Sequence, residues 1–167
     1  MNTLKIFSLL LLGTATIGQA QDIEQAKKAM DAEQYEKAKS MLKSIIQAKP
    51  ANGRAAFFLG NVYLKQNIED SAKIYFQKGL TAAEGGRLNY IGLGQLDLDN
   101  NNLVGAKTNF DTATKDMKKK DIEEYIYVAK AYMNSDKRDY KTALEYLNKA
   151  KAINPTDALT QDRKSVV

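Results

Sequence analysis

The chain has 167 residues, of which 44% are hydrophobic and 27% charged, a composition typical of one or two globular domains. It contains no cysteine, histidine or tryptophan, which excludes disulfides, Cys/His zinc sites and catalytic triads built on histidine. The formal net charge is +5, but residues 21–161 carry 22 basic and 19 acidic side chains, so no nucleic-acid partner is indicated. We therefore expect no enzyme activity, no metal site and no cofactor.

Residues 1–20 show the three parts of a secretory signal peptide. Lys5 supplies the positive start, Ile6 to Leu12 is almost wholly apolar, and Gly18-Gln19-Ala20 places small residues before a cleavage site. The apolar run is too short for a membrane anchor, and no cysteine follows it for a lipid anchor. We expect cleavage before Gln21 and a mature protein that is exported, either periplasmic or secreted, in a bacterial envelope.

An internal repeat follows the leader. Four alanines recur at spacings of 34, 34 and 37 residues: Ala38, Ala72, Ala106 and Ala143. Four residues after each alanine lies a large apolar side chain: Leu42, Phe76, Phe110 and Leu147. A second series precedes them: Leu59-Gly60 with Tyr63, Leu93-Gly94, and Val128-Ala129 with Tyr132. A period of this length predicts stacked units, and the two series predict two amphipathic helices in each unit.

The apolar pattern, together with Asn, Asp and Gly-rich turns, sets the expected helix bounds. In chain order we expect helices near 22–32, 35–49, 52–66, 69–83, 87–99, 103–117, 121–134 and 139–153. Small residues in these helices would let backbones approach closely, while large ones would fill the volume between successive pairs.

The pattern resembles the tetratricopeptide repeat (TPR) family over residues 22 to about 160. The resemblance implies an all-α fold, an α-solenoid of about four stacked helix pairs that form a right-handed superhelix. Its units would span about 22–52, 53–86, 87–120 and 121–157, followed by the start of a fifth, within a repeat array at 21–161. The structural repeat positions are Gly60, Tyr63, Ala72, Phe76, Gly94, Ala106, Phe110, Ala143 and Leu147.

The sequence departs from the family pattern in three places. Asp97 occupies the position held by Tyr63 and Tyr132 in other units. The prolines that close the first and fourth units are replaced by Glu84 and Lys118 in the second and third. The fourth unit also carries a longer internal loop, from Ser135 to Asp139.

Several motifs resemble functional sites but lack residues or structural elements that those sites require. Asp97-x-Asp99-x-Asn101 imitates the start of a calcium loop, yet Asn102 stands where the loop glycine is required and Thr108 where the glutamate is. We interpret it as a polar turn in which Asn102 caps a helix. Gly92-Leu93-Gly94 lacks the preceding strand of a dinucleotide site, so we assign it to helix packing.

Two charged motifs are likewise assigned to the surface. Lys118-Lys119-Lys120 lies in a turn between units beside Asp116 and Asp121, which favours a solvated loop. Glu123 and Glu124 are adjacent on a helix and point in different directions, so they do not form a catalytic pair.

The resemblance implies that the first helices of the units line a concave ligand-binding surface. The groove candidates are Arg54, Phe57, Asn61, Leu64, Lys65, Ile91, Gln95, Leu98, Ile126, Lys130 and Met133. Asn61, Gln95 and Lys130 share one register and could hydrogen-bond an extended peptide, while Phe57, Ile91 and Ile126 could form an apolar floor. Ordinary helix surface is the alternative interpretation of each position.

Family members that bind the terminal carboxylate of chaperones use a clamp of lysine and asparagine side chains. Here Phe57 stands at the lysine position, Gly92 at that of the second asparagine, and Glu123 and Tyr127 at those of the later cations. The resemblance therefore implies that this clamp is absent.

These features predict a scaffold or adaptor of the cell envelope that binds a protein or peptide through its concave groove. The alternative is an exported sensor or recruiting arm of a longer envelope-anchored or signalling protein. We expect the chain to be an N-terminal fragment, because Thr156 to Gln161 begins a fifth unit while Asp162 to Val167 resembles a translated sequencing-adapter read. An incomplete array would favour end-to-end self-association.

Overall fold

The computed structural model describes residues 14–82, 84–117 and 122–155, and this part of the chain folds into eight helices. Most of the predicted signal peptide, the Lys118-Lys119-Lys120 turn, the start of a fifth unit and the predicted non-native tail lie outside the described residues. Within the described ranges, no helix combines the length and the apolar character needed to cross a membrane.

The helix bounds agree closely with the sequence periodicity. The helices are α1 (Thr14–Asp31), α2 (Tyr35–Ala48), α3 (Gly53–Lys65), α4 (Glu69–Leu80), α5 (Gly86–Asp99), α6 (Leu103–Thr114), α7 (Glu123–Asn134) and α8 (Tyr140–Ile153). Only α1 differs markedly, since it begins at Thr14 and includes the end of the predicted signal peptide. No proline or turn sequence separates Thr14 from Asp31, so nothing interrupts the helix once it has formed. Cleavage before Gln21 stays a prediction.

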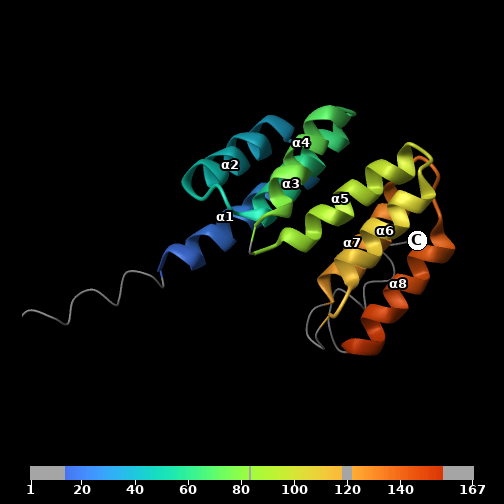
Figure 1. The fold of residues 1–167 in the computed structure, drawn as a ribbon. Coiled ribbons are helices and arrows are strands. Elements are labelled where there is room, and N and C mark those ends of the chain that lie inside the picture. Colours follow the sequence, from blue (N-terminus) through green and yellow to red (C-terminus); the bar gives the residue numbers. More distant parts are fainter. Residues whose placement is uncertain (1–13, 83, 118–121, 156–167) are drawn as a thin grey trace, which may run out of the picture.

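The helices form four consecutive pairs that stack side by side (Figure 1). Each helix packs on its partner within the pair, and α3, α5 and α7 also pack on one another in sequence. The second helix of one pair contacts the first helix of the next, as α2 contacts α3 and α4 contacts α5. This arrangement confirms the predicted all-α solenoid of helix pairs.

Small and large side chains alternate through the core as the repeat pattern predicts. The ring of Phe76 on α4 is fully buried, and a Cβ added at either Gly60 or Gly92 would lie 2.3 Å from its Cε1 atom. The ring therefore lies against glycines of both α3 and α5. In the next pair, a Cβ at Gly94 would lie 2.5 Å from Phe110 Cε1. These glycines are required because a phenyl ring fills the space that a side chain would occupy.

The polar turn after α5 is a helix cap, as predicted. The Asn102 side chain accepts a hydrogen bond from the Gly105 N–H and so caps the start of α6. Asp97 accepts hydrogen bonds from the Asn102 and Asn109 side chains at 2.9 and 2.7 Å. The aspartate that replaces the usual tyrosine therefore joins α5 to α6 through a polar network.

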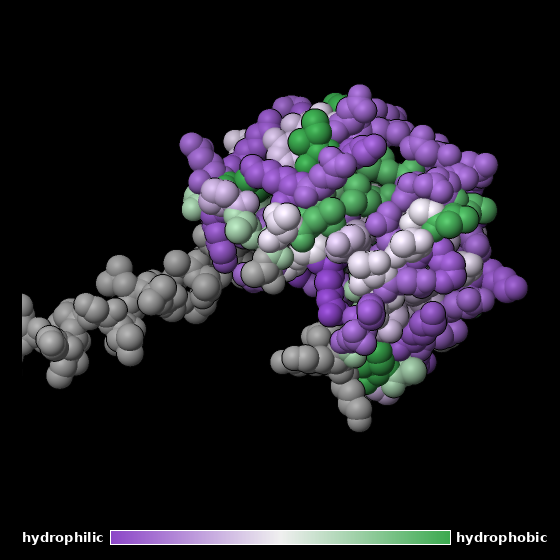
Figure 2. Space-filling view, in the orientation of Figure 1, coloured by the Kyte–Doolittle hydropathy of each residue, from purple (hydrophilic) through white to green (hydrophobic). Residues whose placement is uncertain are grey.

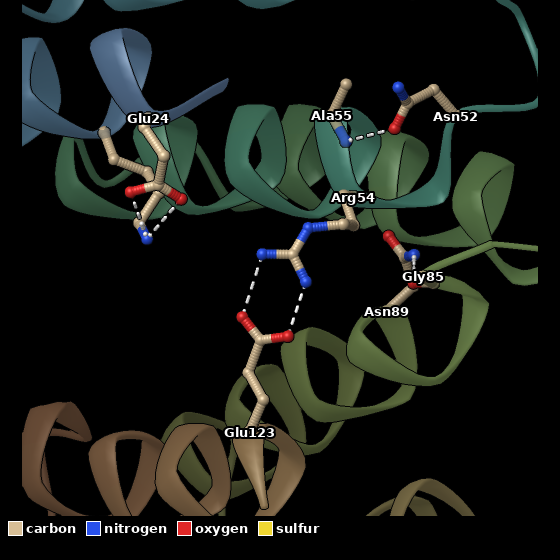
Figure 3. Close-up of polar contacts among 8 residues, drawn as sticks. Glu24, Asn52, Arg54, Ala55, Gly85, Asn89 and Glu123 are labelled. Carbon is tan, nitrogen blue, oxygen red and sulfur yellow. Dashed lines mark hydrogen bonds and ion pairs between the residues drawn. The ribbon is translucent and has the colours of Figure 1, made fainter. Parts of the chain in front are cut away.

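The first helices of the second and fourth units touch each other directly, across α5. Arg54 on α3 forms a two-point ion pair with Glu123 on α7, in which Arg54 Nη2 lies 2.9 Å from Glu123 Oε1 (Figure 3). The ring of Tyr127 lies edge-on to those of Phe57 and Phe58, with centroids 5.1 and 5.9 Å apart. We call this set of five residues the α3–α7 contact.

The two aromatic residues of this contact share a repeat position with Gly92 of α5. Phe58, Gly92 and Tyr127 occupy equivalent positions in successive units, at spacings of 34 and 35 residues. The Phe76 ring fills the space that a side chain at Gly92 would occupy. The stack of helix pairs curves tightly enough for the aromatic rings of α3 and α7 to meet across α5.

We expect Gly94→Leu to lower the free energy of unfolding by about 3 kcal/mol, because overpacking would displace either Phe110 or the α5 backbone. Urea unfolding followed by circular dichroism measures the change. Lys73→Ala on the exposed side of α4 is the control and should change stability by less than about 0.5 kcal/mol. Equal stability of the two variants would contradict the packing described for Gly94.

A double-mutant cycle tests the ion pair of the α3–α7 contact. The side chains of Arg54 and Glu123 are 28% and 35% exposed, so we expect Arg54→Ala and Glu123→Ala to show a coupling energy of about 1 kcal/mol. The more exposed pair Lys107 and Asp111 within α6 serves as the matched control and should couple by less than about 0.5 kcal/mol. A coupling energy near zero for the first pair would show that the ion pair does not stabilise the α3–α7 contact in solution.

Candidate functional site

A groove of about 550 Å³ opens on the side of the solenoid formed by α1, α3, α5 and α7. Its floor includes Phe57 and Ile91, both 2% exposed. The structure places eight of the eleven predicted positions around this groove: Phe57, Asn61, Leu64, Lys65, Ile91, Gln95, Lys130 and Met133. Contact of these residues with a ligand stays a prediction.

The other three candidates, Arg54, Leu98 and Ile126, do not line this groove. Arg54 is engaged by Glu123 in the α3–α7 contact and is not among the groove-lining residues. Leu98 is buried in the main core. Ile126 packs with Ile122 in a small second cluster and faces a hollow of about 240 Å³ between α1 and α7. The floor position expected for Ile126 is taken by its neighbour Tyr127, whose ring meets Phe57.

One row of hydrogen-bonding side chains runs across all four first helices. Asn61, Gln95 and Lys130 were expected in this row, and Lys27 of α1 completes it from 34 residues before Asn61. Sequence reasoning missed Lys27 because the first helix of the first unit carries a weak repeat signal. The 34-residue spacing between Lys27 and Asn61 could have identified this position. We call these four residues the groove row.

The two lysines of the groove row differ in their electrostatic surroundings. Lys27 donates hydrogen bonds to both carboxylate oxygens of Glu24 at 2.9 and 3.0 Å, and its Nζ atom lies 5.3 Å from the Phe58 ring centroid. Lys130 Nζ lies 5.6 Å from the Tyr127 ring centroid and forms no ion pair within the described ranges. Both ammonium groups thus lie against aromatic rings beside the floor, an arrangement that stabilises a cation.

Three carboxylates gather at the other end of the groove, from Glu69, Asp99 and Asp136. The Asp136 N–H donates to Asp99 Oδ1 at 3.2 Å, and Asn100 Nδ2 donates to a Glu69 oxygen at 3.3 Å. Burial raises the pKa of Asp99 above its usual value, and the negative charges of Asp136 and Glu69 act in the same direction. We call these three residues the acidic end of the groove.

The groove combines an apolar floor with several kinds of polar group. An apolar floor is flanked by amide, ammonium and carboxylate groups that can hydrogen-bond a main chain or pair with its side chains. Among the residues that the structure describes, no group of three acidic side chains is arranged to hold a metal ion.

The last helix pair presents apolar side chains to solvent, as does α6. Tyr140 and Leu144 on α8 are 55% and 48% exposed, and Leu103 and Val104 on α6 are 60% and 80% exposed. Figure 2 shows hydrophobic areas separated by hydrophilic ones on the face turned toward the viewer. Exposed apolar side chains are therefore not confined to the last helix pair, and the expected end-to-end association of the chain stays a prediction.

Comparison with known protein families and structures gives a consistent result. Tetratricopeptide repeat family models match residues 29–88 and 124–157. YrrB, described as a TPR protein with an unusual peptide-binding site, is 22% identical over 88% of this chain and 74% of its own, with a TM-score of 0.47.

PilF of Pseudomonas aeruginosa is 15% identical over 85% of this chain, with a TM-score of 0.58. The chain spans 64% of the length of PilF, and at this identity the likeness concerns the fold alone. No protein of curated function matches the sequence. Together the two matches cover more than half of the chain, and the chain therefore belongs to the tetratricopeptide repeat family.

Proposed function

We propose that this protein is a non-catalytic scaffold whose concave groove binds an extended segment of another protein. The observation that carries the proposal is the groove row, in which four polar side chains from four successive units border one apolar floor. Such hydrogen-bonding groups can bind the main chain of an extended segment, while the floor accepts apolar side chains. Membership of a repeat family whose members bind proteins supports this interpretation.

The α3–α7 contact supports the same function by preorganising the groove. It fixes the distance between the second and fourth units before any ligand arrives, so binding does not have to order these helices. A rigid site loses less conformational entropy on association than a flexible one.

We further propose that the scaffold acts in the bacterial envelope after export. The support is the three-part pattern of residues 1–20. A chain without cysteine has no thiol to oxidise in that compartment, which is consistent with export.

Replacement of the groove row tests the binding proposal. The variant Asn61→Ala/Gln95→Ala/Lys130→Ala should lose proteins that the wild type captures from an envelope extract, because the lost groups would contact the ligand. The matched control replaces exposed residues on the second helices, Gln47→Ala/Lys73→Ala/Gln77→Ala. Quantitative mass spectrometry compares the captured proteins.

Both variants should keep their thermal stability nearly unchanged, because none of the replaced side chains is buried. Equal capture by the groove variant and its control would refute the groove assignment.

Export is tested separately by expressing the full chain in a bacterial host with a periplasm. We expect protein recovered from the periplasm to begin at Gln21 by intact-mass measurement. The variant Leu9→Lys/Leu11→Lys interrupts the apolar run and should stay in the cytoplasm with residues 1–20 attached. Periplasmic recovery of that variant, or cytoplasmic retention of the unaltered chain, would contradict the signal-peptide assignment.

A further inference from the structure

The charge distribution of the groove indicates which segment it accepts, an inference that rests on the proposed function. We propose that the bound segment places a lysine or arginine side chain at the acidic end, beside an apolar side chain on the Phe57 and Ile91 floor. The groove thus selects extended segments in which a basic residue stands near an apolar one.

The acidic end is built from three separate elements that converge on one cavity. Glu69 opens α4, Asp99 closes α5, and Asp136 follows α7. The hydrogen bond from the Asp136 N–H to Asp99 links the third and fourth units there. The three carboxylates therefore come together only because the helix pairs stack, and they line the same groove as the apolar floor.

No cation within the described ranges neutralises these carboxylates. None of the three forms an ion pair there, and Lys65, which also lines the groove, forms none either. Lys137, which follows Asp136 in sequence, donates to Asn101 Oδ1 and does not line the groove. Partial burial and mutual repulsion make the charged form of Asp99 costly, and an incoming cation would offset that cost.

Backbone dipoles add to the negative potential at this end. The helices α3, α5 and α7 end at Lys65, Asp99 and Asn134, and all three of these residues line the groove. The carbonyl ends of helices carry partial negative charge and favour cations. The carbonyl ends of α3, α5 and α7 therefore act in the same direction as the carboxylates, while the amino end of α4 at Glu69 opposes them.

Apolar residues beside the acidic end suit a long basic side chain. Leu64 and Met133 line the groove one residue before Lys65 and Asn134 respectively. The methylene stem of a lysine or arginine can pack on such side chains while its charged group reaches the carboxylates. Lys27 pairs with Glu24, which leaves Lys65 and Lys130 as the basic groove residues without an ion pair in the described ranges. Four acidic residues line the same groove, Asp31, Glu69, Asp99 and Asp136, so acidic groups are in excess.

A displayed library of random decapeptides, selected on the immobilised full chain, tests the inference. We expect selected peptides to be enriched in lysine or arginine near an apolar residue. Replacing the basic residue of a selected peptide by glutamine should weaken binding about tenfold, the effect of losing one charge-assisted contact, as measured by fluorescence anisotropy. That difference should shrink at high salt, because exposed charges are screened.

The variant Asp99→Asn/Asp136→Asn should bind the basic peptide about tenfold more weakly than the wild type does. Its affinity for the glutamine version of that peptide should equal that of the wild type. The matched control, Asp70→Asn/Glu145→Gln, removes two exposed acidic charges outside the groove and should bind both peptides as the wild type does. Circular dichroism confirms that both variants fold, because asparagine keeps an oxygen acceptor at each position.

The outcomes separate this inference from the proposed function. Selected peptides that depend on the groove row but show no basic preference would overturn the inference and leave the proposed function standing. An Asp99→Asn/Asp136→Asn variant that binds the basic peptide like the wild type would overturn it as well. Failure to select any peptide that depends on Asn61, Gln95 and Lys130 would overturn both.

Discussion

The site described here depends on the direct contact between α3 and α7 across α5. In an open stack of helix pairs, each unit touches only its neighbours and the concave face stays shallow. Here an ion pair and an aromatic cluster join the second and fourth units and close one side of that face. The groove is consequently a defined cavity rather than a gently curved surface, with a fixed floor and fixed polar walls.

Two residue choices that look unrelated in the sequence serve the packing of these helices. Gly92 on α5, which shares its repeat position with Phe58 and Tyr127, accommodates the ring of Phe76. Glu123 stands at a position where relatives with a carboxylate clamp carry a cation, and here it binds Arg54 instead. Groups that could have served ligand binding are thus used to set the shape of the groove.

The repeat made most of the architecture predictable. Helix pairs can stack only if small and large side chains alternate along them. Repeat positions such as Ala72, Phe76 and Gly94 therefore predicted the first and last residues of α2 to α8 to within three residues. The row of Asn61, Gln95 and Lys130 followed from the same period, because equivalent positions of successive units face the same way. The start of α1 did not follow, since its first unit repeats the pattern only weakly.

The sequence did not predict features that depend on the curvature of the helix stack. Whether Arg54 meets Glu123 depends on the angle accumulated over two helix pairs, and a spacing of 69 residues contains no such information. The rotation of α7 about its axis likewise decides which of its residues faces Phe57, and in the structure this is Tyr127, while Ile126 lines the smaller hollow beside α1. The acidic end likewise joins a helix start, a helix end and a loop, which no single periodic pattern connects.

Nuclear Overhauser effects between aromatic side chains test the central claim most directly. In the free protein, the α3–α7 contact predicts cross-peaks from the ring protons of Tyr127 to those of both Phe57 and Phe58, whose centroids lie 5.1 and 5.9 Å away. Cross-peaks between Phe57 and Phe76, 6.1 Å apart within one helix pair, provide the internal reference. Detection of the reference cross-peaks without those to Tyr127 would show that the second and fourth units stand apart and that the groove is open.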